Sequence, residues 1–91
     1  MSKKNASPSA KQLFLFLLHE GGWWTVKELA GAMAEQTAAQ RRLIGNTLRH
    51  LVDGGSVIKR AAETRAIECM EFGVTATCAV PAGITLEELQ P

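Results

Sequence analysis

The fold is decided by residues 25–60, which read TVKELAGAMAEQTAAQRRLIGNTLRHLVDGGSVIKR. This stretch contains the signals for a short helix, a turn, a longer helix that carries arginines, a Gly-Gly break and then an apolar and basic strand. The order of elements predicts that one exposed helix face lies beside a β-hairpin, with basic side chains on both.

Capping signals mark where the two helices of this stretch begin. Thr25 and Glu28 have the spacing of a capping box, and Thr37 with Gln40 repeats it before the second helix. We expect the second helix to run to about Asp53, where Gly54-Gly55 breaks it. The buried face of the first helix is predicted to comprise Val26, Leu29, Ala30 and Met33, with a turn over residues 34–36.

The residues of the longer helix divide between a buried face and an exposed face. Ile44, Leu48 and Leu51 recur at helical spacing and are expected in the core. The opposite side then comprises Ala39, Arg42, Asn46, Arg49 and Asp53, with Arg41 flanking it. Arginine can donate two hydrogen bonds to guanine and asparagine can pair with adenine, so this row suits base edges and phosphates. An ordinary solvated helix face is the alternative interpretation.

Gly45 interrupts the longer helix, at a cost of about 1 kcal/mol relative to alanine. Two explanations for Gly45 are left open by the sequence: another helix packs closely against it, or a backbone approaches it closely.

Beyond the Gly-Gly break, residues 56–60 are predicted to form a strand that ends in Lys59 and Arg60. In a hairpin, residues 61–66 form its tip and bring Arg65 near Arg60, where both can reach phosphate. A helix over residues 61–70 is the alternative, because that segment is rich in helix formers. Alternating residues predict a further strand over 74–80, followed by a short helix at 86–89 capped by Thr85.

The N-terminal part is expected to comprise a flexible arm at 1–8 and then a helix, capped by Ser9 and Gln12 and ending near Glu20, within a single domain at 9–91. Residues 13–18 are all apolar and therefore point all round this helix. Either other elements cover the surplus, or Leu15 or Phe16 lies in a homodimer interface. Trp23-Trp24 is expected to be a short extended segment that packs against the protein.

Charge is unevenly distributed along the 91 residues, whose net charge is only +1. Lys and Arg minus Asp and Glu gives 4 − 3 = +1 for residues 1–35, 6 − 2 = +4 for 36–65 and 0 − 4 = −4 for 66–91. The basic third is therefore the part that carries the arginine-bearing helix and the first strand, and it is the segment expected to meet an anionic partner.

Other residues argue against a metal-binding protein, an enzyme and a membrane protein. Cys69 and Cys78 lie nine apart without a histidine at ligand spacing, so we expect reduced thiols and no zinc site. His19 and His50 lack a paired acid or nucleophile, which predicts no enzyme, no cofactor and no small-molecule substrate. The apolar run at 13–18 is too short for a membrane span or signal peptide, so a cytoplasmic protein is expected.

The segments Thr25-Val-Lys-Glu-Leu-Ala30, Leu48-Arg-His-Leu51 and Asp53-Gly-Gly-Ser-Val-Ile-Lys-Arg60 resemble the winged helix-turn-helix domains of bacterial and phage transcriptional regulators. Residues 72–83 are similar to small prophage-type members of that class. The resemblance implies an α+β, mainly α fold: a three-helix core with a small antiparallel β-wing. Between the first helix of this stretch and the end of the longer helix, the chain holds more residues than the usual spacing of that class. The residues expected at DNA are Gln40, Arg41, Arg42, Asn46, Arg49, Lys59, Arg60 and Arg65.

Two functions follow as expectations. The first is a sequence-specific regulator that binds double-stranded DNA. If its DNA target has two half-sites, we expect a homodimer formed through the first helix. The second is a winged-helix adaptor that binds a host or regulatory protein through the apolar face of the first helix or the acidic C-terminal segment.

Overall fold

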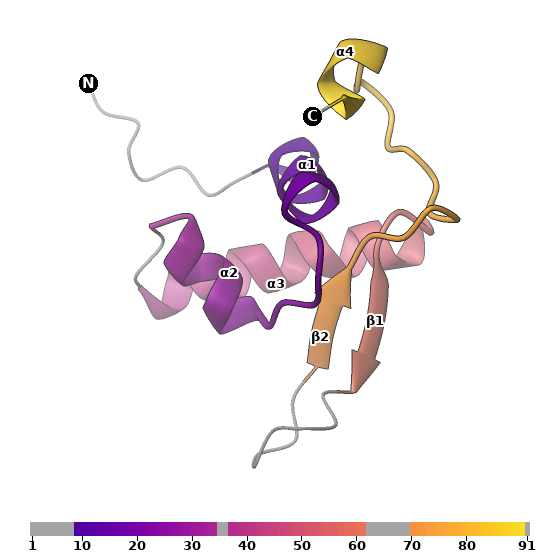
Figure 1. The fold of residues 1–91 in the computed structure, drawn as a ribbon. Helices are drawn as coiled ribbons and strands as arrows, with labels where there is room; N and C mark the ends of the chain where they lie inside the picture. The colour runs from indigo at the N-terminus through magenta and orange to yellow at the C-terminus, as the bar shows by residue number, and fades with distance from the viewer. Residues whose placement is uncertain (1–8, 35–36, 62–69, 91) are drawn as a thin grey trace, which may run out of the picture.

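The computed structural model describes residues 9–34, 37–61 and 70–90. Its elements, in chain order, are α1 (Ala10–Glu20), α2 (Val26–Ala32), α3 (Ala38–Asp53), β1 (Ile58–Ala61), β2 (Met70–Gly73) and α4 (Leu86–Leu89). The protein is thus a small, mainly helical α+β fold with a two-stranded antiparallel sheet. Figure 1 shows α1 crossing above α3, α2 beside them, and the hairpin extending away from the helices. The proposed arm at 1–8 lies outside the described residues.

Local capping fixes where the helices begin. Ser9, Thr25, Thr37 and Thr85 each form a complete capping box with the residue three positions later. At α3 the Gln40 N–H donates to Thr37 Oγ1 at 3.1 Å, and the Thr37 N–H donates to Gln40 Oε1 at 3.0 Å. These reciprocal bonds satisfy backbone donors that a helix start leaves unpaired. The predicted starts of all four helices are confirmed.

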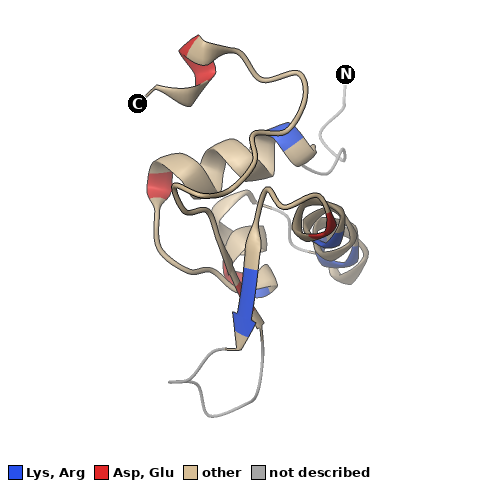
Figure 2. Ribbon diagram, turned by 90° about the vertical axis from the view of Figure 1, so that its right-hand side faces the viewer, with Lys and Arg blue, Asp and Glu red and all other residues tan. Residues whose placement is uncertain are grey.

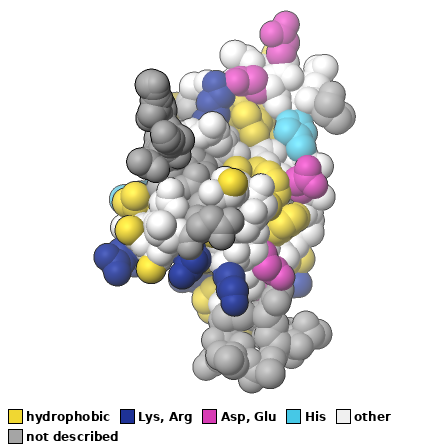
Figure 3. Space-filling model, turned by 90° about the vertical axis from the view of Figure 1, so that its left-hand side faces the viewer, with side chains coloured by type: hydrophobic (Ala, Val, Ile, Leu, Met, Phe, Trp, Pro, Cys, Tyr) yellow, Lys and Arg dark blue, Asp and Glu magenta, His cyan; other side chains and the backbone are white. Residues whose placement is uncertain are grey.

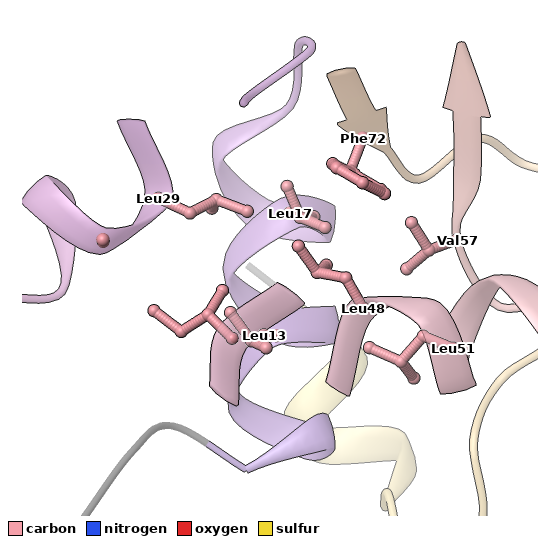
Figure 4. Close-up of a cluster of buried hydrophobic side chains, with 9 residues drawn as sticks. Leu13, Leu17, Leu29, Leu48, Leu51, Val57 and Phe72 are labelled. Atoms are coloured by element: carbon pink, nitrogen blue, oxygen red, sulfur yellow. The ribbon is translucent and has the colours of Figure 1, made fainter. Parts of the chain in front are cut away.

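The core lies where α1, α2, α3 and the hairpin converge. Figure 4 shows Leu13 and Leu17 of α1 and Leu29 of α2 pointing toward Leu48 of α3, with Phe72 completing the cluster. The predicted α3 seam is confirmed, because the buried residues of that helix are Ile44, Leu48 and Leu51. Each such side chain contributes about 1.5–3 kcal/mol when fully buried, so this seam holds the opposite face of α3 toward solvent.

Two paired strands follow α3, and the alternative of a helix over residues 61–70 does not fit its two end residues, which lie in β1 and β2. β1 and β2 pair antiparallel, with Lys59 opposite Phe72 and Arg60 opposite Glu71. Trp24 extends this pairing: its N–H donates to Phe72 O at 2.9 Å and its carbonyl accepts from Phe72 N at 2.7 Å. The extended Trp23-Trp24 segment is therefore confirmed and ties the hairpin to the loop before α2. Ala61, expected at the start of the hairpin tip, is the last residue of β1. The rest of the expected tip, including Arg65, lies outside the described residues.

The predicted strand over residues 74–80 is wrong. The second strand is Met70–Gly73, and a turn follows it in which Cys78 N–H donates to Thr75 O at 3.1 Å and Thr75 N–H donates to Cys78 Sγ at 3.3 Å. These local hydrogen bonds form in place of strand pairing, although residues 74–80 alternate in polarity. Cys78 is a free cysteine, and Cys69, with which the expectation of two reduced thiols also deals, lies outside the described residues.

The surplus apolar surface of α1 is covered in part by the chain itself. Phe16 packs edge-on against Trp24, with ring centroids 4.9 Å apart. On another side α4 contacts α1, where Lys11 Nζ lies 2.6 Å from Glu88 Oε2 and His19 Nε2 lies 2.8 Å from Glu88 O. Leu15 remains half-buried, and a homodimer through α1 stays a prediction.

Candidate nucleic-acid interface

The outer face of α3 presents a row of polar side chains to solvent. Arg42, Asn46 and Arg49 are all exposed, as the sequence predicts, because they lie opposite the buried seam. Among the described residues, none of these three side chains has a hydrogen-bond or ion-pair partner. Their donors are therefore available to a ligand without any internal bond having to break.

Gln40 and Arg41 differ from that row. Both are only half-exposed, and the Gln40 amide oxygen is engaged in the cap of α3 by the backbone N–H and the hydroxyl of Thr37. Arg41 also interacts elsewhere within the chain. The structure therefore separates these two residues, which the sequence placed in the same candidate set, from the unpaired row.

A groove of about 230 Å³ runs between α3 and the hairpin. Arg49 borders it on the helix side, and Lys59 faces it from β1. Gly45, Val52 and Asp53 of α3, together with Met70 and Phe72 of β2, complete its lining. The groove thus brings a cation of the helix and a cation of the hairpin to one concave surface.

Strand alternation sends Lys59 and Arg60 to opposite faces of the hairpin. The Arg60 guanidinium lies 4.0 Å from the centroid of the Trp23 ring, and its Nε lies 3.2 Å from Glu71 Oε1. Gly73 leaves room for this packing, since a Cβ there would lie 2.9 Å from Gly22 O and 3.0 Å from the Trp23 ring. Arg60 therefore serves as a contact between the hairpin and Trp23, away from the groove that Lys59 faces.

Acidic groups lie mainly away from this surface. In Figure 2 blue marks α3 and β1, and also part of α1 and of α2, whereas the red residues of α4 lie beside α1 at the end of the molecule away from the hairpin. Figure 3, seen from the side opposite to Figure 2, shows Lys and Arg side chains low on the surface with an acidic side chain beside them, and acidic side chains next to a basic one at the upper end, where α4 lies. The negatively charged C-terminal segment therefore does not cover α3. Asp53 is the exception, because it lines the groove itself.

Other kinds of site find little support in the part of the chain that is described. Residues 9–34, 37–61 and 70–90 hold no group of three metal-ligating side chains. None of the helices in these ranges has the length and apolar character needed to cross a bilayer. The chain matches no protein-family model, no curated protein and no solved structure. Functional inference therefore depends on the geometry of α3 and the hairpin.

The sequence predicted the exposed polar row of α3. It did not predict that Lys59 and Arg60 lie on opposite faces of the hairpin. It placed Lys59 and Arg60 together as phosphate contacts, although strand alternation was the signal that separates them. It also missed Met70 and Phe72, which line the groove from β2. Their position depends on the pairing of Phe72 with Trp24, a contact between residues far apart in the chain.

Proposed function

We propose that this protein is a sequence-specific double-stranded DNA-binding protein of the winged helix-turn-helix type, acting as a small bacterial- or phage-type transcriptional regulator. In this proposal α3 is the recognition helix and the β1–β2 hairpin is the wing. The order α1, extended Trp24, α2, α3, β1, β2 supports it.

One observation carries the proposal: Arg42, Asn46 and Arg49 form an exposed, unpaired row on a single helix, beside a groove that Lys59 also faces. A helix fits the major groove of B-DNA, and these residue types match its base edges and phosphates. Arg42 and Asn46 are assigned to base readout, where a good bidentate pair discriminates by about 1–3 kcal/mol. Arg49 and Lys59, at the groove, are assigned to the phosphate backbone.

The first experiment is selection of duplexes from a random pool, followed by anisotropy titration of the recovered duplex at several salt concentrations. Arg49→Ala is expected to weaken binding roughly tenfold and to lower the salt dependence by about one released ion. Its fold should remain intact, because Arg49 is exposed and outside the core.

Lys11→Ala is the matched control. It removes the same charge, but from α1, where Lys11 is engaged with Glu88 of α4. Binding by this variant should fall much less than for Arg49→Ala. Equal losses in the two variants would show that only net charge matters, and recovery of no enriched duplex by the wild type would reject the proposal.

A protein-binding adaptor is the second candidate. It is favoured by exposed apolar side chains on the same two elements: Leu43 of α3 is 49% exposed, and Met70 of β2 is 38% exposed. The low net charge of +1 agrees with it. A stoichiometric protein complex that is lost on Leu43→Ser, together with no affinity for any duplex, would favour the adaptor over the regulator.

A further inference from the structure

Gly45 is unexplained by the fold of the protein itself. It occupies the middle of α3, where glycine is among the poorest helix formers. Apart from its chain neighbours and the adjoining backbone of α3, a Cβ built on Gly45 meets no atom of the described chain within 4 Å, so packing does not require its absence. Its backbone is also not among the positive-φ glycines, which are Gly21, Gly22, Gly55 and Gly83. Neither of the two usual structural reasons for a helical glycine applies.

The surroundings of Gly45 are cationic. Gly45 lines the groove that Arg49 and Lys59 also border. Long side chains on a helix point back toward its N-terminus, so the side chain of Arg49, one turn later, extends toward Gly45. Arg42 lies three residues earlier and is exposed on the neighbouring part of the helix surface. An anion resting on this spot would meet bare helix backbone below it and guanidinium and ammonium groups around it.

We propose that Gly45 keeps its side of the groove open for the sugar–phosphate backbone of one DNA strand, which approaches α3 more closely than any side chain would allow. The absence of a Cβ permits such an approach. The occupant is assigned from charge: Arg49 and Lys59 have no ion-pair partner among the described residues, and they border the groove. Asp53 also lines it, but lies eight residues beyond Gly45, or about 12 Å along the helix. This inference rests on the proposed function.

The test compares Gly45→Ala with Gly31→Ala. Gly31 is likewise helical, in α2, and a Cβ on it also meets nothing within 4 Å, but it does not line the groove. Both variants should melt higher than the wild type, by roughly 4–8 °C if the full helix preference for alanine is realised. Only Gly45→Ala should weaken DNA binding, by about tenfold, which is the value of one charged hydrogen bond.

Two duplexes distinguish backbone contact from base readout: the duplex recovered by selection, and a mixed-sequence duplex at low salt. Contact with the phosphate backbone predicts that Gly45→Ala weakens both by a similar factor. Weakening of the selected duplex alone, unchanged binding, or a melting temperature below that of the wild type would each overturn the role assigned to Gly45. If the wild type binds neither duplex, the proposed function itself fails, and this is seen before any variant is measured.

Discussion

Asp53 carries a negative charge into a groove that otherwise gathers cations. It lines the groove with Arg49 and Lys59, is exposed, and has no ion-pair partner among the described residues. It is also the last residue of α3, where the helix dipole disfavours a carboxylate. Both effects make this side chain unfavourable for the free protein and for an anionic partner.

Asp53→Asn is therefore expected to improve two properties at once. Relief of the dipole should stabilise the protein by about 0.3–1 kcal/mol. Loss of the negative charge should strengthen binding to duplex DNA several-fold at low salt, with the gain shrinking as salt screens the interaction. Urea denaturation and anisotropy titration measure the two effects. Glu87→Gln on the distant α4 is the control for net charge, and an equal gain in affinity there would contradict a local effect of Asp53.

At this scale the sequence was informative about helix faces and less so about strands. Arg42, Asn46 and Arg49 could be assigned to solvent because the buried residues of α3 recur every three to four positions. Strand alternation puts Lys59 and Arg60 on opposite faces, but the sequence did not show which of them faces the groove, because β1 is exposed along its whole length and has no apolar alternation. The stacking of Arg60 on Trp23 joins residues that only the tertiary fold brings together.

Among the elements, α3 is the one whose N-terminal turn depends most on capping. Thr37 and Gln40 satisfy each other's backbone donors there, on an exposed part of the chain where no core packing supports the helix start. The residues proposed to read DNA begin only two positions after Gln40, so fraying of this turn would disorder Arg42 before it affected the core.

Thr37→Ala is expected to destabilise the protein by about 1 kcal/mol and to weaken DNA binding as well. Thr37→Ser keeps the hydroxyl and should restore both. Denaturation in urea gives the first quantity and anisotropy the second. If Thr37→Ala lowered stability but left affinity unchanged, the first turn of α3 would not contribute to the interface.

Element boundaries show what short-range sequence patterns can predict. The capping boxes at Ser9, Thr25 and Thr37 were predicted as residue pairs three apart, and Thr85 was predicted as a cap, because capping is a contact within one turn. The second strand was misplaced because two long-range contacts decide it: Phe72 pairs with Trp24, and Ala79 N–H donates to Gly55 O at 2.9 Å. Neither contact leaves a periodic signal in the sequence.

For the molecule as a whole, the acidic C-terminal segment is held on the side away from α3. The Lys11 ammonium, the Thr85 backbone N–H and the Thr85 hydroxyl all hydrogen-bond Glu88, and the nearby Lys11 charge acts in the same direction, so the pKa of the Glu88 carboxyl lies below its usual value of 4.5. Partial desolvation opposes this shift but is smaller than the leading causes. The lowered pKa means that the ionised form favours docking of α4 on α1.

The stability that Glu88 contributes should therefore be present above about pH 4.5 and be lost as the pH falls through its lowered folded-state pKa. Comparing the wild type with Glu88→Gln between neutral pH and pH 3 tests this: the difference in unfolding free energy should shrink with acidity. The readout is chemical denaturation, with amide exchange along α4 as a local measure. A difference that stays constant across this range would show that the carboxylate charge does not hold α4 in place.

The two indoles sit where the helical layer meets the hairpin, with Trp23 beneath Arg60 and Trp24 bonded to β2. The chain has no tyrosine and no further tryptophan. Its near-ultraviolet emission consequently originates at this one junction, so a spectrofluorimeter can follow hairpin movement in the unlabelled protein when an oligonucleotide is added.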